Sequence, residues 1–205
     1  QDEAMKICAS KLGMPIASLD YRKAPEHPYP AAPEDCYAGV CWVFKHASDM
    51  GMDAHNIGLM GISAGGGLAL AAALMLRDRQ GPSLKYLVPL CPMIDDRHHT
   101  DSSKTVLDIG IWDREGSIEA WNWYLGDSKP DVYAAPARAD DLSSLPPTYI
   151  DVGDLDLFRD EDMLIAQRLS AAGIPVEFHL WTGAYHVSEL FAPQAKLSKA
   201  IWATR

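Results

Sequence analysis

The feature that most limits the fold is an alternation of short apolar runs with longer helical patterns along the 205-residue chain. The apolar runs show no polar alternation, which indicates strands buried on both faces of a sheet. Parallel strands joined by helices satisfy this pattern, so the sequence predicts an α/β fold in a single domain, residues 1–205. The expected strands are 15–22, 57–61, 86–91, 147–153 and 175–181, and the expected helices are 3–12, 31–51, 64–79, 115–124, 159–172 and 193–204.

Composition narrows the classes of partner. The chain has 18 basic and 28 acidic residues, a formal charge of −10 that argues against nucleic acid or an anionic membrane surface. No apolar run approaches the ~18 residues that would span a bilayer. The cysteines show neither CxxC pairs nor metal-ligand spacings, so free thiols, no metal, no cofactor and a cytoplasmic location are expected. These cysteines are Cys8, Cys36, Cys41 and Cys91.

A serine lies at the junction between the run at 57–61 and the helix that follows, in the pattern Gly61-Ile62-Ser63-Ala64-Gly65. A sharp strand-to-helix turn crowds its neighbours, and glycine two positions to either side removes Cβ atoms that would clash. A phosphate-binding loop would need a lysine beside the serine, and the glycines do not match a dinucleotide fingerprint. The pattern therefore favours Ser63 as a nucleophile, held at the positive end of a helix.

A serine nucleophile needs a histidine base and a carboxylate that orients it, and both should follow later strands. His186 lies just beyond the last expected strand, whereas His179 is inside that strand and is read as a packed or edge histidine. Asp154 and Asp156 follow the preceding strand, and spacing alone does not separate them. The acidic residues 160–162 open a helix, where negative charge suits the helix dipole without a catalytic role.

Four stretches, in order along the chain, resemble motifs of the hormone-sensitive-lipase-like esterases, a branch of the α/β-hydrolase superfamily. They are "DYRKAPEHPYPAAPED" at 20–35, "GISAGGG" at 61–67, "DLFRDE" at 156–161 and "GAYH" at 183–186. The resemblance implies Ser63 as nucleophile, His186 as base and Asp156 as acid. Leu157 replaces the family's usual proline, and Ile62 replaces its usual acidic residue.

The activity that this resemblance implies is a serine carboxylesterase that hydrolyses small to medium acyl esters through an acyl-enzyme. The backbone N–H of Ala64 is the expected oxyanion donor next to the nucleophile. An arylformamidase or amide hydrolase would use the same residues and stays an alternative. A non-catalytic ligand-binding relative, such as the plant gibberellin receptor, has lost the histidine, so His186 counts against that reading.

The remaining oxyanion donors of the family come from a His-Gly-Gly-Gly loop that precedes the 20–35 motif, and this sequence contains no such loop. A strand that lies between 15–20 and 57–61 in the family's sheet is also missing, which predicts a gap in the sheet. The chain is therefore expected to be the C-terminal two-thirds of an esterase, or an inactive fragment of one. Completion by a preceding segment or by a second chain stays open, and so does a homodimer.

Residues 92–146 interrupt the alternation, and in the family such an insert contributes to a cap over the active site. Trp112 in this insert and Ile62 elsewhere are expected to contact the substrate. Tyr21 is expected either to contact it or to brace the wall near the site. Acidic residues and histidines also gather at 93–103, but adjacent histidines rarely share one ion, so no metal site is predicted there.

Overall fold

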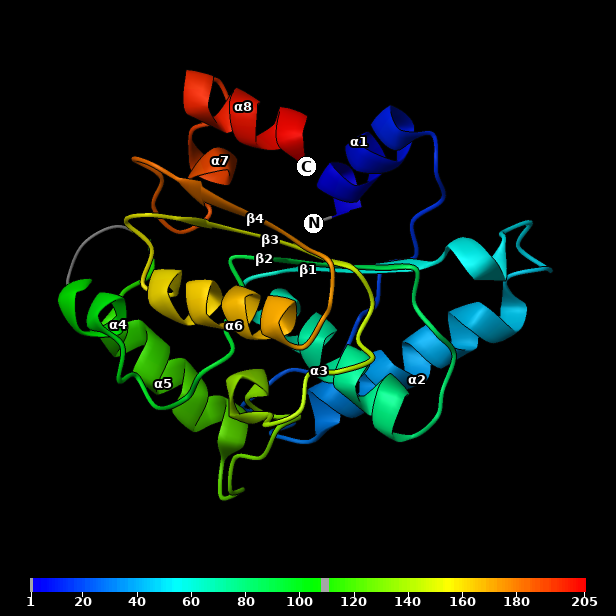
Figure 1. Cartoon of the computed structure of the whole chain (residues 1–205), viewed down its shortest axis with the longest axis horizontal. Helices are drawn as coiled ribbons and strands as arrows, with labels where there is room; N and C mark the ends of the chain where they lie inside the picture. Colours follow the sequence, from blue (N-terminus) through cyan, green and yellow to red (C-terminus); the bar gives the residue numbers. More distant parts are fainter. Residues whose placement is uncertain (1, 108–110) are drawn as a thin grey trace.

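A parallel sheet of four strands, in the order β1-β2-β3-β4, forms the centre of the molecule in the computed structural model, which describes residues 2–107 and 111–205 (Figure 1). Each strand pairs in parallel with the next one along the chain, so their carboxyl ends lie at one edge of the sheet. This confirms the predicted α/β class. The strands are β1 (Gly58–Ile62), β2 (Tyr86–Leu90), β3 (Thr148–Gly153) and β4 (Val176–Trp181).

Helices cover both faces of the sheet. Figure 1 shows α2, α3 and α6 on one face and α1, α7 and α8 on the other, with α4 and α5 beyond α6. The helices are α1 (Asp2–Leu12), α2 (Ala31–His46), α3 (Ala64–Asp78), α4 (Asp101–Thr105), α5 (Arg114–Leu125), α6 (Arg159–Ala171), α7 (Ser188–Phe191) and α8 (Lys196–Thr204), and the short 3-10 turns are η1 (Ala54–Asn56) and η2 (Pro136–Arg138).

The core lies between the sheet and helices α3 and α6. Helix α3 is apolar all round, and every residue from 66 to 76 is buried because the sheet covers one side and α2 the other. Leu70 and Leu74 of α3 meet Leu87 and Ile150 of the sheet in the largest apolar cluster. Burying each such side chain contributes about 1.5–3 kcal/mol to the stability of the fold. This packing therefore fixes α3 against the sheet, next to Ser63.

The predicted strand at 15–22 is wrong. These residues have irregular structure, and the sheet ends at β1, which pairs with β2 on one side only. A β-strand needs a hydrogen-bonding neighbour, and no described segment supplies one for this stretch. The predicted gap inside the sheet is therefore not seen, because the four strands that form are contiguous. Helix α7 and the short α4 also differ from the sequence prediction, which placed no helix at either position.

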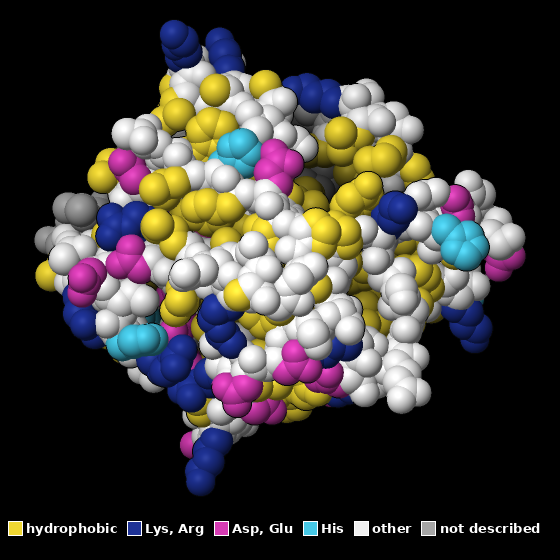
Figure 2. Space-filling model, in the orientation of Figure 1, with side chains coloured by type: hydrophobic (Ala, Val, Ile, Leu, Met, Phe, Trp, Pro, Cys, Tyr) yellow, Lys and Arg dark blue, Asp and Glu magenta, His cyan; other side chains and the backbone are white. Residues whose placement is uncertain are grey.

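The surface carries no single-sign field on the face seen in Figure 2, where acidic and basic side chains are interspersed with apolar atoms. All four cysteines are free, as predicted, although only Cys36 and Cys91 are buried. None of the helices in the described part of the chain combines the length and the apolarity needed to cross a membrane.

Candidate active site

Ser63 sits on a strained turn between β1 and α3. Its backbone has φ of 57° and ψ of −120°, a region that residues other than glycine rarely occupy. The end of β2 clamps this turn from one side, since the Ser63 N–H donates to the Leu90 carbonyl at 2.9 Å and the Ser63 carbonyl accepts from the Met93 N–H at 3.0 Å. The surrounding hydrogen bonds thus hold the serine in a conformation that it would not adopt alone.

Close packing around this turn explains some of the glycines and corrects one expectation. A Cβ atom on Gly61 would overlap the backbone of Gly65, and one on Gly67 would overlap the carbonyl of Met93. A Cβ on Gly65 itself would meet no described atom within 4 Å. The expected steric need for glycine therefore holds at Gly61 but not at Gly65, and it also applies at Gly66 and Gly67, which pack against the loop after β2.

The three residues expected to form a triad are joined by two hydrogen bonds. The His186 Nε2 atom lies 2.9 Å from the Ser63 Oγ atom, and the His186 Nδ1 atom lies 2.8 Å from an Asp156 carboxylate oxygen. Asp156 is 1% exposed and His186 is 5% exposed, so water competes little for these bonds. The other Asp156 oxygen accepts from the Phe158 N–H at 3.0 Å, which fixes the rotation of the carboxylate.

The loops that carry the acid and the base are fastened to each other, and this distinguishes two aspartates that spacing left equivalent. Asp154 accepts a hydrogen bond from the Gly183 N–H at 2.7 Å, and the Leu155 N–H donates to the Ala184 carbonyl at 3.1 Å. Asp154 therefore ties the two loops together, while Asp156 is the carboxylate that contacts the imidazole of His186.

Aromatic rings enclose the imidazole. The Phe158 ring meets His186 edge-on at 5.2 Å between centroids, and the Trp112 ring lies 6.4 Å away. Trp112 belongs to residues 92–146, so this segment approaches the imidazole. The buried Trp112 indole N–H has no hydrogen-bond partner among the described residues.

The other predicted site residues lie at different distances from the chemistry. Ala64 is the first residue of α3, so its N–H has no acceptor within its own helix. Ile62 is the half-buried last residue of β1 and directly precedes Ser63. Tyr21 packs between α2 and α3 against Cys36 and Leu68, and no hydrogen bond joins it to the triad in the described part of the chain.

Sequence reasoning missed a group of buried acids behind the triad. Glu161 and Asp162 lie in the first turn of α6, as predicted, but both are buried, which the charge pattern at the helix start did not indicate. Glu161 accepts from the Ile94 N–H at 3.1 Å, whereas neither Asp162 oxygen has a partner among the described residues. Burial raises the pKa of Asp162 well above its ordinary 3.8, and the Glu161 and Asp156 carboxylates add to the rise.

Helical spacing carried the missing signal for Asp162. It lies three, four and seven residues before Ile165, Ala166 and Leu169, which form the buried face of α6. Cys91 is also buried, near Asp156. Desolvation raises the pKa of its thiol, and the negative charge of Asp156 adds a smaller rise.

Cys91, Asp156 and His186 offer donor atoms that lie within 4.8 Å of one another, the one group of three possible metal ligands in the described ranges. Asp156 and His186 already bond to each other, so we assign no ion here. In the 93–103 cluster, Asp95 pairs with Arg97 at 2.7 Å, while the His98 Nε2 atom lies 3.0 Å from the buried Ser117 hydroxyl.

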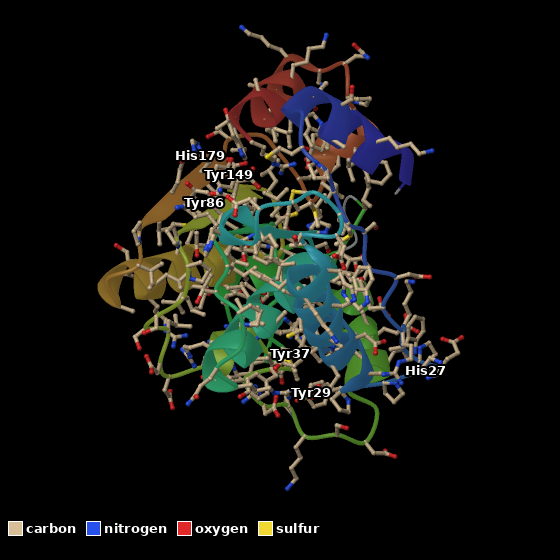
Figure 3. The ribbon with its side chains drawn as sticks, turned by 90° about the vertical axis from the view of Figure 1, so that its right-hand side faces the viewer. His27, Tyr29, Tyr37, Tyr86, Tyr149 and His179 are labelled. Atoms are coloured by element: carbon tan, nitrogen blue, oxygen red, sulfur yellow. The ribbon has the colours of Figure 1, made fainter. Side chains whose placement is uncertain are left out.

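His179 occupies the edge position expected of it. It lies on β4 beside Tyr149 (Figure 3), stacks on Trp181 and contacts Glu177 at 2.8 Å. These contacts account for its place in the structure without any part in the Ser63 site.

A serine on a strand-to-helix turn, with an acid and a histidine on the loops after later parallel strands, is the arrangement found in α/β hydrolases. A family model described as the α/β hydrolase fold matches residues 1–190. The chain belongs to this family, in the hormone-sensitive-lipase-like branch that its motifs predicted.

Individual relatives agree with this assignment. The chain is 38% identical over 167 residues to Esterase LipI of Mycobacterium tuberculosis, covering 80% of this chain and 52% of the relative. Carboxylesterase NlhH of the same species is 35% identical over 168 residues, with 79% and 52% covered. The structure of a bacterial heroin esterase superposes with a TM-score of 0.87 at 39% identity, over 90% of this chain and 60% of that one. The chain thus spans about half the length of these curated relatives.

Proposed function

We propose that this protein is a serine carboxylesterase that hydrolyses small to medium acyl esters through an acyl-enzyme. The observation that carries the proposal is the hydrogen-bonded chain from the Ser63 hydroxyl through His186 to Asp156 at the carboxyl edge of a parallel sheet. Two of the relatives are named as an esterase and a carboxylesterase, which supports this reaction class over other hydrolases.

In the proposed mechanism, the His186 Nε2 atom takes the proton of the Ser63 hydroxyl as the Ser63 oxygen attacks the ester carbonyl. Asp156 holds the proton-bearing Nδ1 atom and stabilises the imidazolium that forms. The tetrahedral intermediate then collapses, and His186 returns the proton to the departing alkoxide, which leaves as the alcohol. Water, deprotonated by His186, attacks the acyl-enzyme and releases the carboxylic acid.

The developing oxyanion needs more than one donor, and we propose that residues outside these 205 complete the site. The Ala64 N–H supplies one donor, and the family's His-Gly-Gly-Gly loop is not in this sequence. Strand β1 supports the idea, because it pairs on one side only and its Met60 is 43% exposed. An added strand from a longer chain, or from a second chain in a dimer, would cover this edge.

For the substrate pocket, we propose that residues 92–146 contribute to a cap over Ser63. Trp112 supports this, since it belongs to these residues and its ring lies 6.4 Å from the His186 ring. Ile62 would contact the substrate next to the nucleophile. Tyr21 would brace the wall between α2 and α3.

Hydrolysis of p-nitrophenyl acetate, butyrate and octanoate, beside the Ser63→Ala variant, tests the proposal. We expect turnover by the chain, or by a longer protein that contains it, and loss of turnover in the variant. Activity that survives Ser63→Ala would refute the nucleophile. Silence from both lengths of protein would instead favour the ligand-binding alternative. Preference for a formanilide over these esters would favour the arylformamidase alternative.

A further inference from the structure

The side chain of Arg205, just after α8, lies between the sheet and α7 and is 9% exposed. Its Nε and Nη2 atoms donate to the two carboxylate oxygens of Asp151 on β3, at 2.7 and 2.9 Å. Tyr149 and Trp181 also donate to Asp151, at 3.2 Å each. This two-point contact fixes the plane of the guanidinium against the central strand that leads to Asp156.

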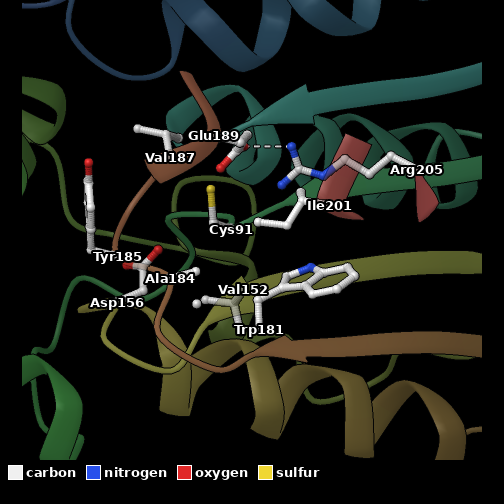
Figure 4. Close-up of a pocket in the computed structure, with 11 residues that line it drawn as sticks. Cys91, Val152, Asp156, Trp181, Ala184, Tyr185, Val187, Glu189, Ile201 and Arg205 are labelled. Carbon is white, nitrogen blue, oxygen red and sulfur yellow. Dashed lines mark hydrogen bonds and ion pairs between the residues drawn. The ribbon is translucent and has the colours of Figure 1, made fainter. Parts of the chain in front are cut away.

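The third contact of Arg205 leads to the loop that carries His186. Its Nη1 atom donates to Glu189 at 2.6 Å, the contact drawn in Figure 4. Glu189 is 3% exposed, lies in α7 and follows His186 by three residues. Arg205 therefore bridges β3 and α7, the two elements that adjoin the acid and the base.

The hydrogen bonds of the His186 loop are distributed unevenly. Before His186, Gly183 and Ala184 bond to the Asp154 loop. After His186, from 187 to 195, the described hydrogen bonds are local to the segment, apart from the one between Glu189 and Arg205. This bond is therefore the polar tether on the far side of the base.

A small cavity lies beside the contact between Glu189 and Arg205. It has a volume of about 10 Å³, is lined by Cys91, Asp156, Glu189 and Arg205 among others, and has room for about one water molecule (Figure 4). Packing is therefore incomplete where Glu189 of α7 and Arg205 meet, and their hydrogen bond supplements it. In the described part of the chain, Arg205 is also the only cation bonded to the buried carboxylates of Asp151 and Glu189.

We propose that Arg205 is a positioning residue for the reaction: through Glu189 it fixes α7 to β3 and so holds His186 in line with Ser63 and Asp156. The role in catalysis rests on the proposed function, whereas the tether itself does not. A displacement of the imidazole by about 1 Å can lower the rate by ~100-fold, so a tether of this kind bears directly on turnover.

The test compares Arg205→Met, Glu189→Ala and Glu189→Gln. Arg205→Met leaves two buried carboxylates without a cation and can fail to fold, but Glu189→Ala keeps the Arg205–Asp151 contact. Arg79→Met is the matched control, because it removes an Arg–carboxylate pair with Glu34 on the surface at 2.6 and 2.9 Å. The readouts are the rate of Ser63 phosphonylation by a p-nitrophenyl phosphonate and hydrogen exchange of the amides at 186–191, below the melting temperature.

We expect Glu189→Ala to slow phosphonylation by between ~10- and ~100-fold at saturating reagent, with little change in apparent affinity, and to raise exchange at 186–191. Glu189→Gln should recover part of the rate, and Arg79→Met should change neither readout. Wild-type rate and exchange in Glu189→Ala would overturn the proposal, as would a lowered melting temperature with an unchanged rate. If neither this chain nor a longer protein that contains it reacts with the phosphonate, the proposed function fails, and exchange alone then decides the tether.

Discussion

The two sides of Ser63 differ in how many contacts hold them. Toward β3 and β4, the acid and base loops are hydrogen-bonded to each other, and Asp156 and His186 are buried. Toward β1, the sheet ends in an exposed edge, and residues 14–23 run past α2 without pairing. The three residues proposed for proton transfer are thus in contact within these 205 residues, whereas the side proposed to stabilise an oxyanion offers one donor, the Ala64 N–H.

The contrast separates two requirements of the proposed reaction: activation of the serine and stabilisation of the tetrahedral intermediate. In the proposed mechanism, activation of the serine needs the residues that follow β1, β3 and β4 to meet, and the four-stranded sheet brings them together. Stabilisation of the tetrahedral intermediate depends on N–H groups that converge from the β1 side. A chain can therefore present a well-ordered nucleophile and still be a slow enzyme.

The largest expected effect tests the complete side. Asp156→Asn should lower kcat/KM for p-nitrophenyl butyrate by about 10⁴-fold, because the amide no longer holds the imidazole in the correct tautomer. Asp154→Asn is the matched control, since its remaining oxygen can still accept from Gly183, and it should cost less than about tenfold. Equal losses in the two variants would contradict the assignment of Asp156.

The incomplete side predicts the next largest effect. A longer protein that contains these residues should exceed the 205-residue chain by ~10²–10³-fold in kcat, the typical contribution of an oxyanion donor. Phosphonylation and ester turnover, measured on both proteins, give the comparison. Equal kcat values would show that the described residues already contain every donor that the reaction needs.

The glycines around the turn sharpen the comparison through stability. Gly61→Ala should destabilise the fold by about 3 kcal/mol, because the added methyl group overlaps the Gly65 backbone. Gly65→Ala, on the open side, should be neutral or stabilising by up to about 1 kcal/mol, since alanine favours a helix. Urea denaturation of both variants decides. A large loss of stability in Gly65→Ala would contradict the open space beside Gly65.

The smallest effect concerns Asp162. Because burial raises its pKa in the folded state, the unfolded chain loses this proton first as pH rises, and stability falls between pH 3.8 and the folded-state pKa. Asp162→Asn should therefore raise the melting temperature more at about pH 8 than at about pH 4. Asp160→Asn, which weakens the contacts of that carboxylate with Ser102 and Arg159, should lower it instead. A pH-independent gain in Asp162→Asn would contradict the raised pKa.

The sequence predicted the elements whose signals are local. Periodicity placed the four observed strands and the longer helices, and the Gly-x-Ser-x-Gly pattern located the turn at Ser63. The strand at 15–22 failed because apolar residues indicate strand propensity but do not supply a hydrogen-bonding partner. Motif resemblance chose Asp156 over Asp154, a choice that spacing could not make.

Features that depend on long-range contacts were not readable in the same way. The Arg205 bridge joins residues 54 and 16 positions apart in the chain, and no local pattern announces such a contact. The burial of Asp162 was not predicted, because a charge at a helix start already has an electrostatic explanation, although its helical spacing from Leu169 placed it on the buried face. Helical spacing, and not charge, therefore indicates whether an acid at a helix start is buried.

The backbone conformation of Ser63 sets stability against the proposed chemistry. With φ of 57° and ψ of −120°, the nucleophile position costs an L-residue about 1–3 kcal/mol, a cost that glycine would largely escape. Replacing the serine by glycine would thus remove the chemistry and stabilise the fold in one step. The turn geometry therefore gives no reason for a serine at this position, whereas the proposed chemistry does.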